Sequence, residues 1–225
     1  MHRTAITLSI FICFALSIPA HATLINGGFE QPVIGPGEAK DFEAKDIPGW
    51  SFASDQTRTI HRDFATAEGE QFLALNGVAA GYIVQEASIV EGLQYQFDFF
   101  YSLPLLPDGN GIPEHANSDT AGAFGFSLEY PSGTGLIPEM VELVVGPGQR
   151  KISEPDWQLY SYQFVAKAEA ITVTFLDLDK SGYLIDGVSL TAVPEPASVL
   201  LLALGLAGLA GFNRRKVKQK QAGTS

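Results

Sequence analysis

The stretch Leu93-Gln94-Tyr95-Gln96-Phe97-Asp98-Phe99-Phe100-Tyr101 alternates polar and aromatic side chains along most of its length. Successive side chains of a β-strand point to opposite faces, so an extended chain here places four aromatic rings on one face. These rings belong to Tyr95, Phe97, Phe99 and Tyr101, and Gln94, Gln96 and Asp98 lie on the other face. The pattern predicts a half-buried strand whose aromatic side packs on a hydrophobic core.

Similar short, alternating stretches recur outward from this one. Further strands are predicted over 71–76, 82–87, 123–130, 157–165, 171–178 and 183–190. Turn signals such as Asn76-Gly77 and Ser181-Gly182 separate them. Between the two ends of the chain, no stretch keeps a helical period for more than two turns. The sequence therefore predicts an all-β domain, with a β-sandwich as its architecture.

The amino-terminal residues 1–22 have the features of a secretory signal. Arg3 precedes a short apolar run, and Ala20-His21-Ala22 has the small-x-small pattern of a signal-peptide cleavage site. We expect cleavage after Ala22; the alternative is an uncleaved anchor helix. Cys13, the only cysteine, lies in this run, so the mature chain would lack disulfides, thiolate nucleophiles and Cys-ligated zinc.

The carboxy-terminal residues 194–225 combine an apolar run with a basic end. Residues 197–212 are apolar or glycine apart from Ser198, and the segment 213–225 carries five lysines and arginines and no acidic residue. A helix of this length spans about 24 Å, so it crosses the roughly 30 Å hydrocarbon core only with local thinning or snorkelling. We expect a short transmembrane helix with a cytoplasmic basic end; the alternative is a soluble core helix.

Just before this run stands Val193-Pro194-Glu195-Pro196, and just after it come Arg214, Arg215 and Lys216. Motif, short helix and basic end, in this order, resemble the PEP-CTERM sorting signal. The resemblance implies that an exosortase and the secretion machinery are partners. It also implies a membrane-anchored precursor, cleavage near Pro-Glu-Pro, and delivery to the outer surface or the exopolysaccharide matrix, the biofilm, of a Gram-negative bacterium.

Residues 23–193 are long enough for one sandwich domain, and we assign them to the ectodomain. They contain 24 acidic residues against 8 lysines and arginines, a formal charge of −16 (8 − 24), whereas the whole chain carries −11. Nucleic acid and anionic lipid are poor partners for such a surface, so we expect no nucleic-acid binding, and cations such as calcium are favoured.

The ectodomain also carries an ordered series of short motifs. The series is Leu24-Ile25-Asn26-Gly27-Gly28-Phe29-Glu30, Ile47-Pro48-Gly49-Trp50, Gly69-Glu70-Gln71-Phe72-Leu73-Ala74-Leu75-Asn76-Gly77, Tyr82-Ile83-Val84-Gln85, Gly92-Leu93-Gln94-Tyr95 and Leu184-Ile185-Asp186-Gly187-Val188-Ser189-Leu190. It resembles jelly-roll, galactose-binding-like domains, the fold of many carbohydrate-binding modules. The resemblance implies a jelly-roll β-sandwich in which the opening and closing segments lie side by side.

The same resemblance implies a structural Ca²⁺, with Glu30 and Asp186 as its side-chain ligands. Backbone carbonyls would complete the six to eight oxygens that calcium takes. The family pattern more often has a second acid where Gly187 stands. The alternatives are that Glu30 accepts backbone N–H groups at a strand edge and that Asp186 is solvated.

Catalytic signatures are scarce in the sequence. His61 and His115 are the histidines outside the predicted signal, and they lack metal-ligand spacing. No Gly-x-Ser-x-Gly elbow and no glycine-rich phosphate loop is found. A carboxylate pair for glycoside hydrolysis stays open, because its separation is a three-dimensional quantity. We predict no enzymatic activity.

Candidate ligand-binding residues come from two regions. Gln94, Gln96, Asp98 and Phe100 offer amides, a carboxylate and a ring for sugar recognition. The long connection 102–122 adds Asp108, Asn110 and His115. Trp157 is an alternative platform, whereas Trp50 is expected to plug the sandwich.

We therefore predict an exported, non-catalytic module that binds glycan or exopolysaccharide. One alternative is a structural or adhesive matrix protein without sugar specificity, and another is a polysaccharide-active enzyme.

Overall fold

The computed structural model describes residues 24–52, 56–75, 82–102, 122–131, 136–145, 154–177, 183–194 and Gly205. These residues form β-strands and one 3-10 helix, which confirms the all-β prediction. The elements are β1 (Ala39–Phe42), η1 (Ala44–Asp46), β2 (Arg58–His61), β3 (Phe72–Ala74), β4 (Tyr82–Ser88), β5 (Gln94–Ser102), β6 (Gly122–Glu129), β7 (Leu136–Val145), β8 (Gln158–Val165), β9 (Ala170–Asp177) and β10 (Leu184–Ala192).

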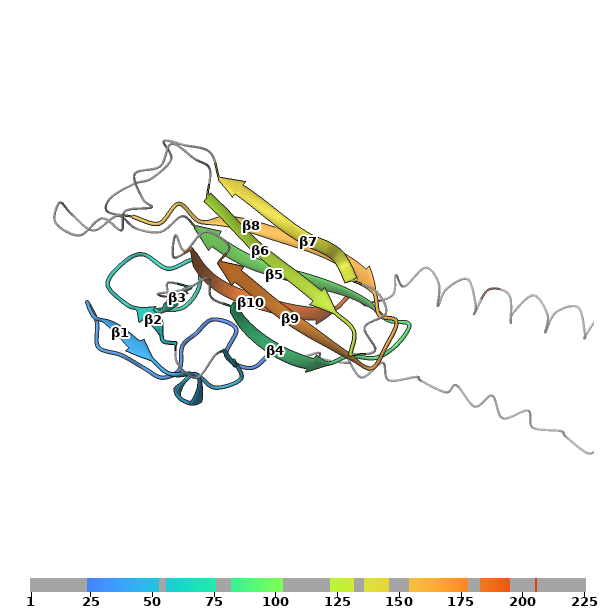
Figure 1. Ribbon diagram of the computed structural model, residues 1–225. Helices are drawn as coiled ribbons and strands as arrows, with labels where there is room; N and C mark the ends of the chain where they lie inside the picture. The colour runs from blue at the N-terminus through green and yellow to red at the C-terminus, as the bar shows by residue number, and fades with distance from the viewer. Residues whose placement is uncertain are drawn as a thin grey trace, which may run out of the picture.

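The strands form two antiparallel sheets that face each other (Figure 1). One sheet has six strands in the order β1-β2-β3-β10-β5-β8, and the other has four in the order β4-β9-β6-β7. The eight strands from β3 to β10 interleave between the sheets as two Greek keys, which is the jelly-roll topology. The predicted jelly roll is thus confirmed, with β1 and β2 as additions beyond β3.

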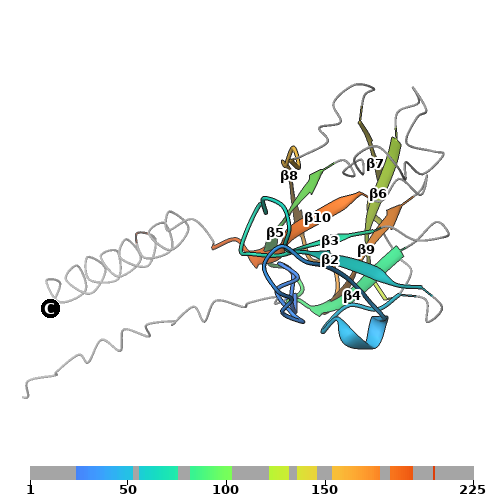
Figure 2. The ribbon, with the colours of Figure 1, turned by 90° about the vertical axis from the view of Figure 1, so that its left-hand side faces the viewer.

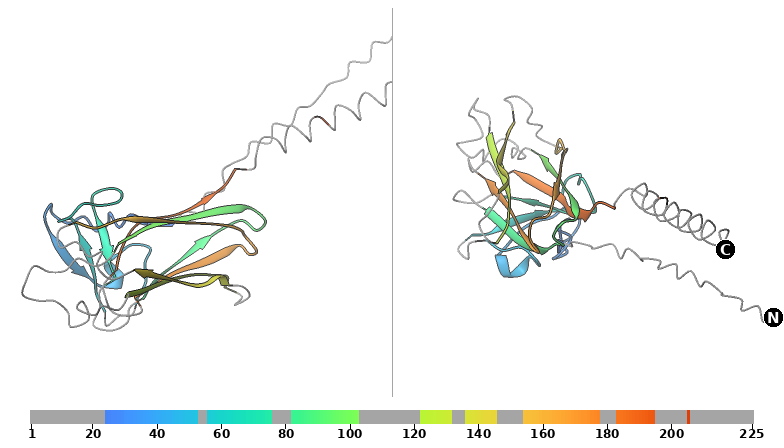
Figure 3. Two further views of the ribbon diagram at one scale, coloured as in Figure 1. Left: turned by 90° about the horizontal axis from the view of Figure 1, so that it is seen from above. Right: turned by 90° about the vertical axis from the view of Figure 1, so that its right-hand side faces the viewer.

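Other views show the same layers. In Figure 2, β5 and β10 lie toward one side, and β6, β7 and β9 lie toward the other. Figure 3 shows the two layers from above and from the opposite end. The six-stranded sheet therefore has one face toward the core and one outer face.

The structure contains seven strands where the sequence predicts them, namely β3 to β6 and β8 to β10. Three strands were missed. Exposure does not alternate along the mostly exposed β1 or along the mostly buried β2, and β7 contains Pro138. Proline is tolerated in a sheet at an edge, and β7 is an edge strand. Strands whose exposure does not alternate were thus harder to predict, and β3, which is buried throughout, was predicted from its short β-rich sequence.

The predicted aromatic face of β5 forms the centre of the core. Tyr95, Phe97 and Phe99 are fully buried, and Tyr101 is partly buried. The ring of Phe99 lies 5.1 Å from that of Phe126 in β6 and 5.0 Å from that of Phe175 in β9, both edge-on. Edge-to-face packing is favourable beyond the burial of area. Phe99 thus joins the two sheets.

Trp50 is buried, as predicted, and its indole Nε1 donates to the carbonyl of Asn26 at 3.1 Å. Within the described residues no helix is long and apolar enough to cross a membrane. The predicted signal 1–22 lies outside these residues, as does the predicted span 197–212 apart from Gly205.

Replacing Phe99 by alanine should lower the free energy of unfolding by about 3–5 kcal/mol, because it removes a ring packed by both sheets. Val33→Ala is the control, since Val33 is 73% exposed and lies on no strand, and its change should stay within about 0.5 kcal/mol. Denaturant unfolding measures both. Equal effects of the two substitutions would contradict the assignment of Phe99 to the core.

Candidate functional site

The first described segment, 24–35, is held against the sandwich by two buried glutamines. The side chain of Gln71 accepts from Ile34 N at 2.7 Å and donates to the carbonyls of Phe29 and Pro32. Gln85 brackets Ile25, accepting from its N–H and donating to its carbonyl. These contacts fix the path of the opening segment over the sheets.

The opening segment also reaches the closing strand. Val188 N donates to the carbonyl of Gly27 at 3.0 Å. A Cβ on Gly27 would lie 1.9 Å from the carbonyl oxygen of Val188, so only glycine allows this approach. The opening and closing segments lie side by side, as the resemblance implied.

Glu30 and Asp186 bind the same stretch of backbone. Glu30 Oε1 accepts from the N–H groups of Glu70 and Gln71 at 2.7 and 3.0 Å. Asp186 Oδ2 accepts from Ala67 and Glu68, each at 2.9 Å. The two carboxylates therefore anchor the connection 62–71, which we call the covering loop: Asp186 holds it to β10 of the six-stranded sheet, and Glu30 holds it to the opening segment.

Asp186 is fully buried, so the alternative of a solvated Asp186 is wrong. Burial raises its pKa to about 7, and the nearby charge of Glu30 adds to the increase. Backbone N–H bonds from Glu68, Gly187 and Ala67 act in the opposite direction. Near neutral pH the buried carboxyl group of Asp186 is therefore partly protonated and partly ionised.

The geometry leaves limited room for a metal ligand set. The hydrogen bonds occupy Glu30 Oε1 and Asp186 Oδ2 with two donors each, and Gly187 N donates to Asp186 Oδ1. Within the part of the chain that the structure describes, Glu30 Oε2 and one lone pair of Asp186 Oδ1 remain for a cation. No group of three or more His, Cys, Asp or Glu in the described ranges is placed to hold one. Calcium binding by Glu30 and Asp186 stays a prediction.

Gly187, where the family pattern more often has an acid, sits in an irregularity of β10 between Asp186 and Ser189. Its φ is +55°, and a Cβ there would lie 3.0 Å from both the Glu68 carboxyl carbon and the Phe100 ring. Any side chain at this position would be strained, because φ lies in the left-handed region and the two neighbouring side chains would have to shift. The contact also places Glu68 and Phe100 next to each other on the outer face.

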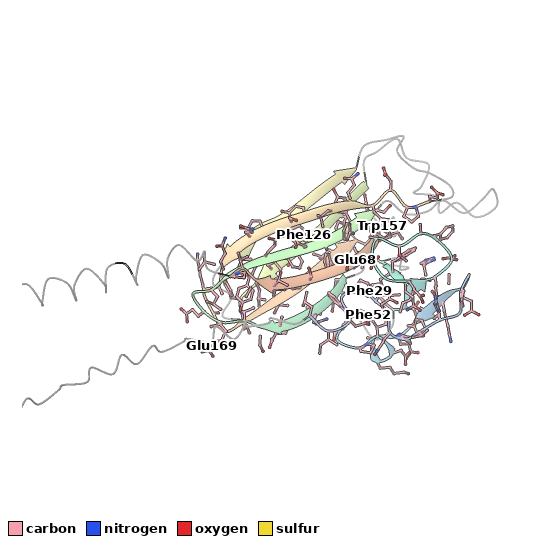
Figure 4. The ribbon with its side chains drawn as sticks, turned by 180° about the vertical axis from the view of Figure 1, so that it is seen from behind. Phe29, Phe52, Glu68, Phe126, Trp157 and Glu169 are labelled. Atoms are coloured by element: carbon pink, nitrogen blue, oxygen red, sulfur yellow. The ribbon has the colours of Figure 1, made fainter. Side chains whose placement is uncertain are left out.

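The covering loop closes one half of the outer face of the six-stranded sheet. Under it, Phe72 and Leu184 are buried, and the Trp157 ring packs edge-on against Phe72 at 5.3 Å. Trp157 Nε1 donates to the carbonyl of Ala65 at 2.9 Å. Figure 4 labels Trp157 and Glu68 close together at one end of the sandwich, opposite Glu169. Trp157, the alternative sugar platform, thus helps to hold the loop.

The other half of this face is open and carries a row of hydrogen-bonded polar side chains, which we call the polar row. Gln94 Nε2 donates to Gln163, whose Nε2 donates to Gln96, each at 3.1 Å. Gln96 Nε2 donates to Asp98 Oδ2 at 2.8 Å, and Ser161 Oγ donates to Asp98 Oδ1 at 2.5 Å. The row runs along the neighbouring strands β5 and β8.

The half-buried Phe100 and the exposed Leu159 are cross-strand partners at one end of the polar row. The structure therefore brings together Gln94, Gln96, Asp98 and Phe100 on the outer face. Gln163, Ser161 and Leu159 were not predicted as site residues, since the alternation of 157–165 indicates which residues share a face but not which strand lies beside them. Asp108, Asn110 and His115 lie outside the described residues.

A comparison with protein families finds a match at the carboxy-terminal tail. Residues 192–216 match the PEP-CTERM protein-sorting motif. This match confirms the recognition of the tail and indicates an exported protein that an exosortase processes at the cell surface. Val193 and Pro194 of the motif are within the described residues, whereas Glu195, Pro196, Arg214, Arg215 and Lys216 are outside them.

Solved structures with a similar chain path include carbohydrate-binding modules. An arabinose-bound MgGH51 α-L-arabinofuranosidase is 14% identical, with 77% of this chain and 27% of that chain covered and a TM-score of 0.48. TmCBM61 in complex with β-1,4-galactotriose is 13% identical over 77% of this chain and 100% of that chain, with a TM-score of 0.44.

A family 35 module from Clostridium thermocellum is 10% identical over 69% and 99% of the two chains, with a TM-score of 0.42. This chain spans about a quarter of the length of the arabinofuranosidase. A comparison with curated proteins gives no match.

Substituting Asp186 by asparagine should remove a pH dependence of stability. Between pH 4 and 7 folded Asp186 keeps a proton that the unfolded chain has released, so its contribution to stability falls as pH rises, by up to about 4 kcal/mol. Below pH 4 and above pH 7 the contribution is constant. Denaturant unfolding in EDTA of both proteins across this range measures the difference between them.

Calcium binding, in contrast, should stabilise the protein through the ionised form of Asp186. If Glu30 and Asp186 bind the ion, its addition at pH 8 should raise the melting temperature of the protein but not of Asp186→Asn, because native-state binding stabilises. Ser189→Ala on the same strand is the control and should keep the response. An equal rise in melting temperature for the unchanged protein and for Asp186→Asn, or no rise in either, would contradict the calcium prediction.

Proposed function

We propose that this exported protein is a non-catalytic module that binds a polysaccharide through the open half of the outer face. The carrying observation is the polar row beside Phe100 and Leu159. Apolar side chains cover the apolar face of a sugar ring, while amide and carboxylate groups bind its hydroxyls. Both kinds of group are adjacent here.

The shape of the surface supports a polymer as the ligand. From Gln94 to Phe100 the strand extends about 20 Å at roughly 3.4 Å per residue. An open strip of this length suits a chain of sugars better than an isolated monosaccharide. The negative charge of the ectodomain disfavours anionic polysaccharides, so the proposed ligand is neutral or cationic.

The polar row is also arranged as a preformed surface. Four side-chain hydrogen bonds hold its amides and its carboxylate in place before any ligand arrives. Preorganised groups lose less conformational entropy on binding. Each amide and carboxylate group has further hydrogen-bonding capacity for hydroxyl groups.

Binding should depend on the ring at the end of the row. Phe100→Ala should weaken binding to a neutral polysaccharide at least about tenfold, which corresponds to roughly 1.4 kcal/mol. Gln163→Ala should weaken it as well. Tyr82→Ala is the matched control, because it removes an exposed ring from β4 of the other sheet.

A glycan array followed by calorimetry on the full chain measures these effects. Melting temperatures establish that each variant is folded. Absence of binding to every glycan, with and without calcium, would contradict the proposal. So would an equal loss for Phe100→Ala and Tyr82→Ala, and a matrix protein without sugar specificity would then be favoured.

We propose further that the tail anchors the precursor in the membrane through residues 197–212 until the exosortase cleaves it. The sorting-motif match supports this route, and the apolar run with its basic end supports the anchor. After cleavage the domain would be delivered to the outer surface or the exopolysaccharide matrix of a Gram-negative cell.

Processing should leave a carboxy terminus close to Pro194-Glu195-Pro196, and mass spectrometry of the exported protein measures it. Replacing Glu195 by alanine should reduce the processed form, because it alters the motif. Glu169→Ala, an acidic residue at a turn between β8 and β9, is the control and should leave processing unchanged. An exported protein that keeps residues 197–225 in full would contradict this route.

A further inference from the structure

The four edges of the two sheets are not equally protected against pairing with another chain. An edge strand offers unpaired N–H and C=O groups, and proteins block such edges with charges, prolines, short strands or covering segments. The edge strand β1 has four residues, among them Lys40 and Asp41. The edge strand β7 carries Pro138 and two glutamates. Both of these edges are therefore blocked by their sequences.

The edge strand β4 is protected in a different way. Ser51 pairs with Val84 in the middle of this strand through two backbone hydrogen bonds of 2.9 and 2.8 Å. The strand also carries Glu86, whose side chain is exposed. Three of the four edges thus have a recognisable block.

The fourth edge is β8, and among the described residues it has no such block. Its eight residues, Gln-Leu-Tyr-Ser-Tyr-Gln-Phe-Val, include no charged residue and no proline. Within the described ranges its only partner strand is β5. It also presents two large exposed hydrophobic side chains, with Leu159 57% and Val165 53% accessible. This edge is suited to receive another strand.

We propose that β8 is the interface of a homodimer, in which two copies of this chain pair their β8 strands antiparallel about a two-fold axis at Tyr162. In this register Leu159 faces Val165 of the other copy, and Ser161 faces Gln163 of the other copy. Apolar residues thus meet apolar residues and polar residues meet polar ones on the outer face. The pattern of β8 is self-complementary, as a two-fold interface requires.

Backbone pairing and charge both agree with this register. In this register odd-numbered residues pair with odd-numbered residues, and even-numbered residues pair with even-numbered ones. In an antiparallel strand the N–H and C=O groups of every second residue point to the same side, so the groups of β8 that point away from β5 find partners on the other copy. Each ectodomain carries a formal charge of −16, and two copies repel each other over most of their surfaces. An uncharged strand is the edge at which this repulsion opposes contact least.

The dimer would join two six-stranded sheets into one continuous sheet. The polar row lies on β5 and β8, so the rows of the two copies would lie side by side on one face. A polymer chain could then contact both copies, which raises its apparent affinity without any new kind of contact. The dimer itself does not depend on the proposed polysaccharide binding.

A charge placed on β8 should break the dimer. Sedimentation velocity of the full chain should show a mass that doubles with concentration, and Val165→Lys should weaken this association at least about tenfold. Val33→Lys is the matched control, because Val33 is 73% exposed and lies on no strand. It should leave the association unchanged, and melting temperatures establish that both variants are folded.

Mixing two variants tests the register. Leu159→Glu alone should also be monomeric, but an equimolar mixture with Val165→Lys should form a heterodimer, since the lysine of one copy faces the glutamate of the other. A chain that stays monomeric up to about 1 mM would overturn the proposal. So would equal effects of Val165→Lys and Val33→Lys, or a mixture that stays monomeric.

Discussion

The packing of aromatic rings between two sheets is the constraint on which the rest of this structure depends. The described residues include no cysteine, so burial of side chains must supply the stability that disulfides give many exported domains. Phe99 contacts rings on β6 and β9, and these strands belong to the opposite sheet. Because the aromatic face of β5 packs against the core, its polar face points outward and is available for binding.

The outer face of the six-stranded sheet is divided by long-range contacts. Glu30 and Asp186 hold the covering loop over one half through backbone N–H groups. The other half keeps its polar row open beside Phe100. The position of the covering loop therefore accounts both for the burial of the Asp186 carboxyl group and for the exposure of the row of amides.

The sequence predicted the parts of this structure that repeat with a period of two. Alternation located β5 and six other strands, and it correctly turned Gln94, Gln96 and Asp98 outward. It could not assign Ser161 or Gln163 to the same row, because cross-strand register depends on residues that are far apart in the chain. The burial of Asp186 was missed for a similar reason, since residues more than a hundred positions earlier cover it.

The junction between the domain and its sorting motif has a consequence for maturation. Val193 N still donates to the carbonyl of Gln94 at 2.8 Å, so the sheet holds the chain up to the first residue of the motif. Pro194 has no N–H and cannot extend this ladder. The end of the folded ladder and the start of the Pro-Glu-Pro sequence therefore coincide, with no spacer between them. A protease acting there would meet a fully folded substrate and would release it without removing a single sheet hydrogen bond.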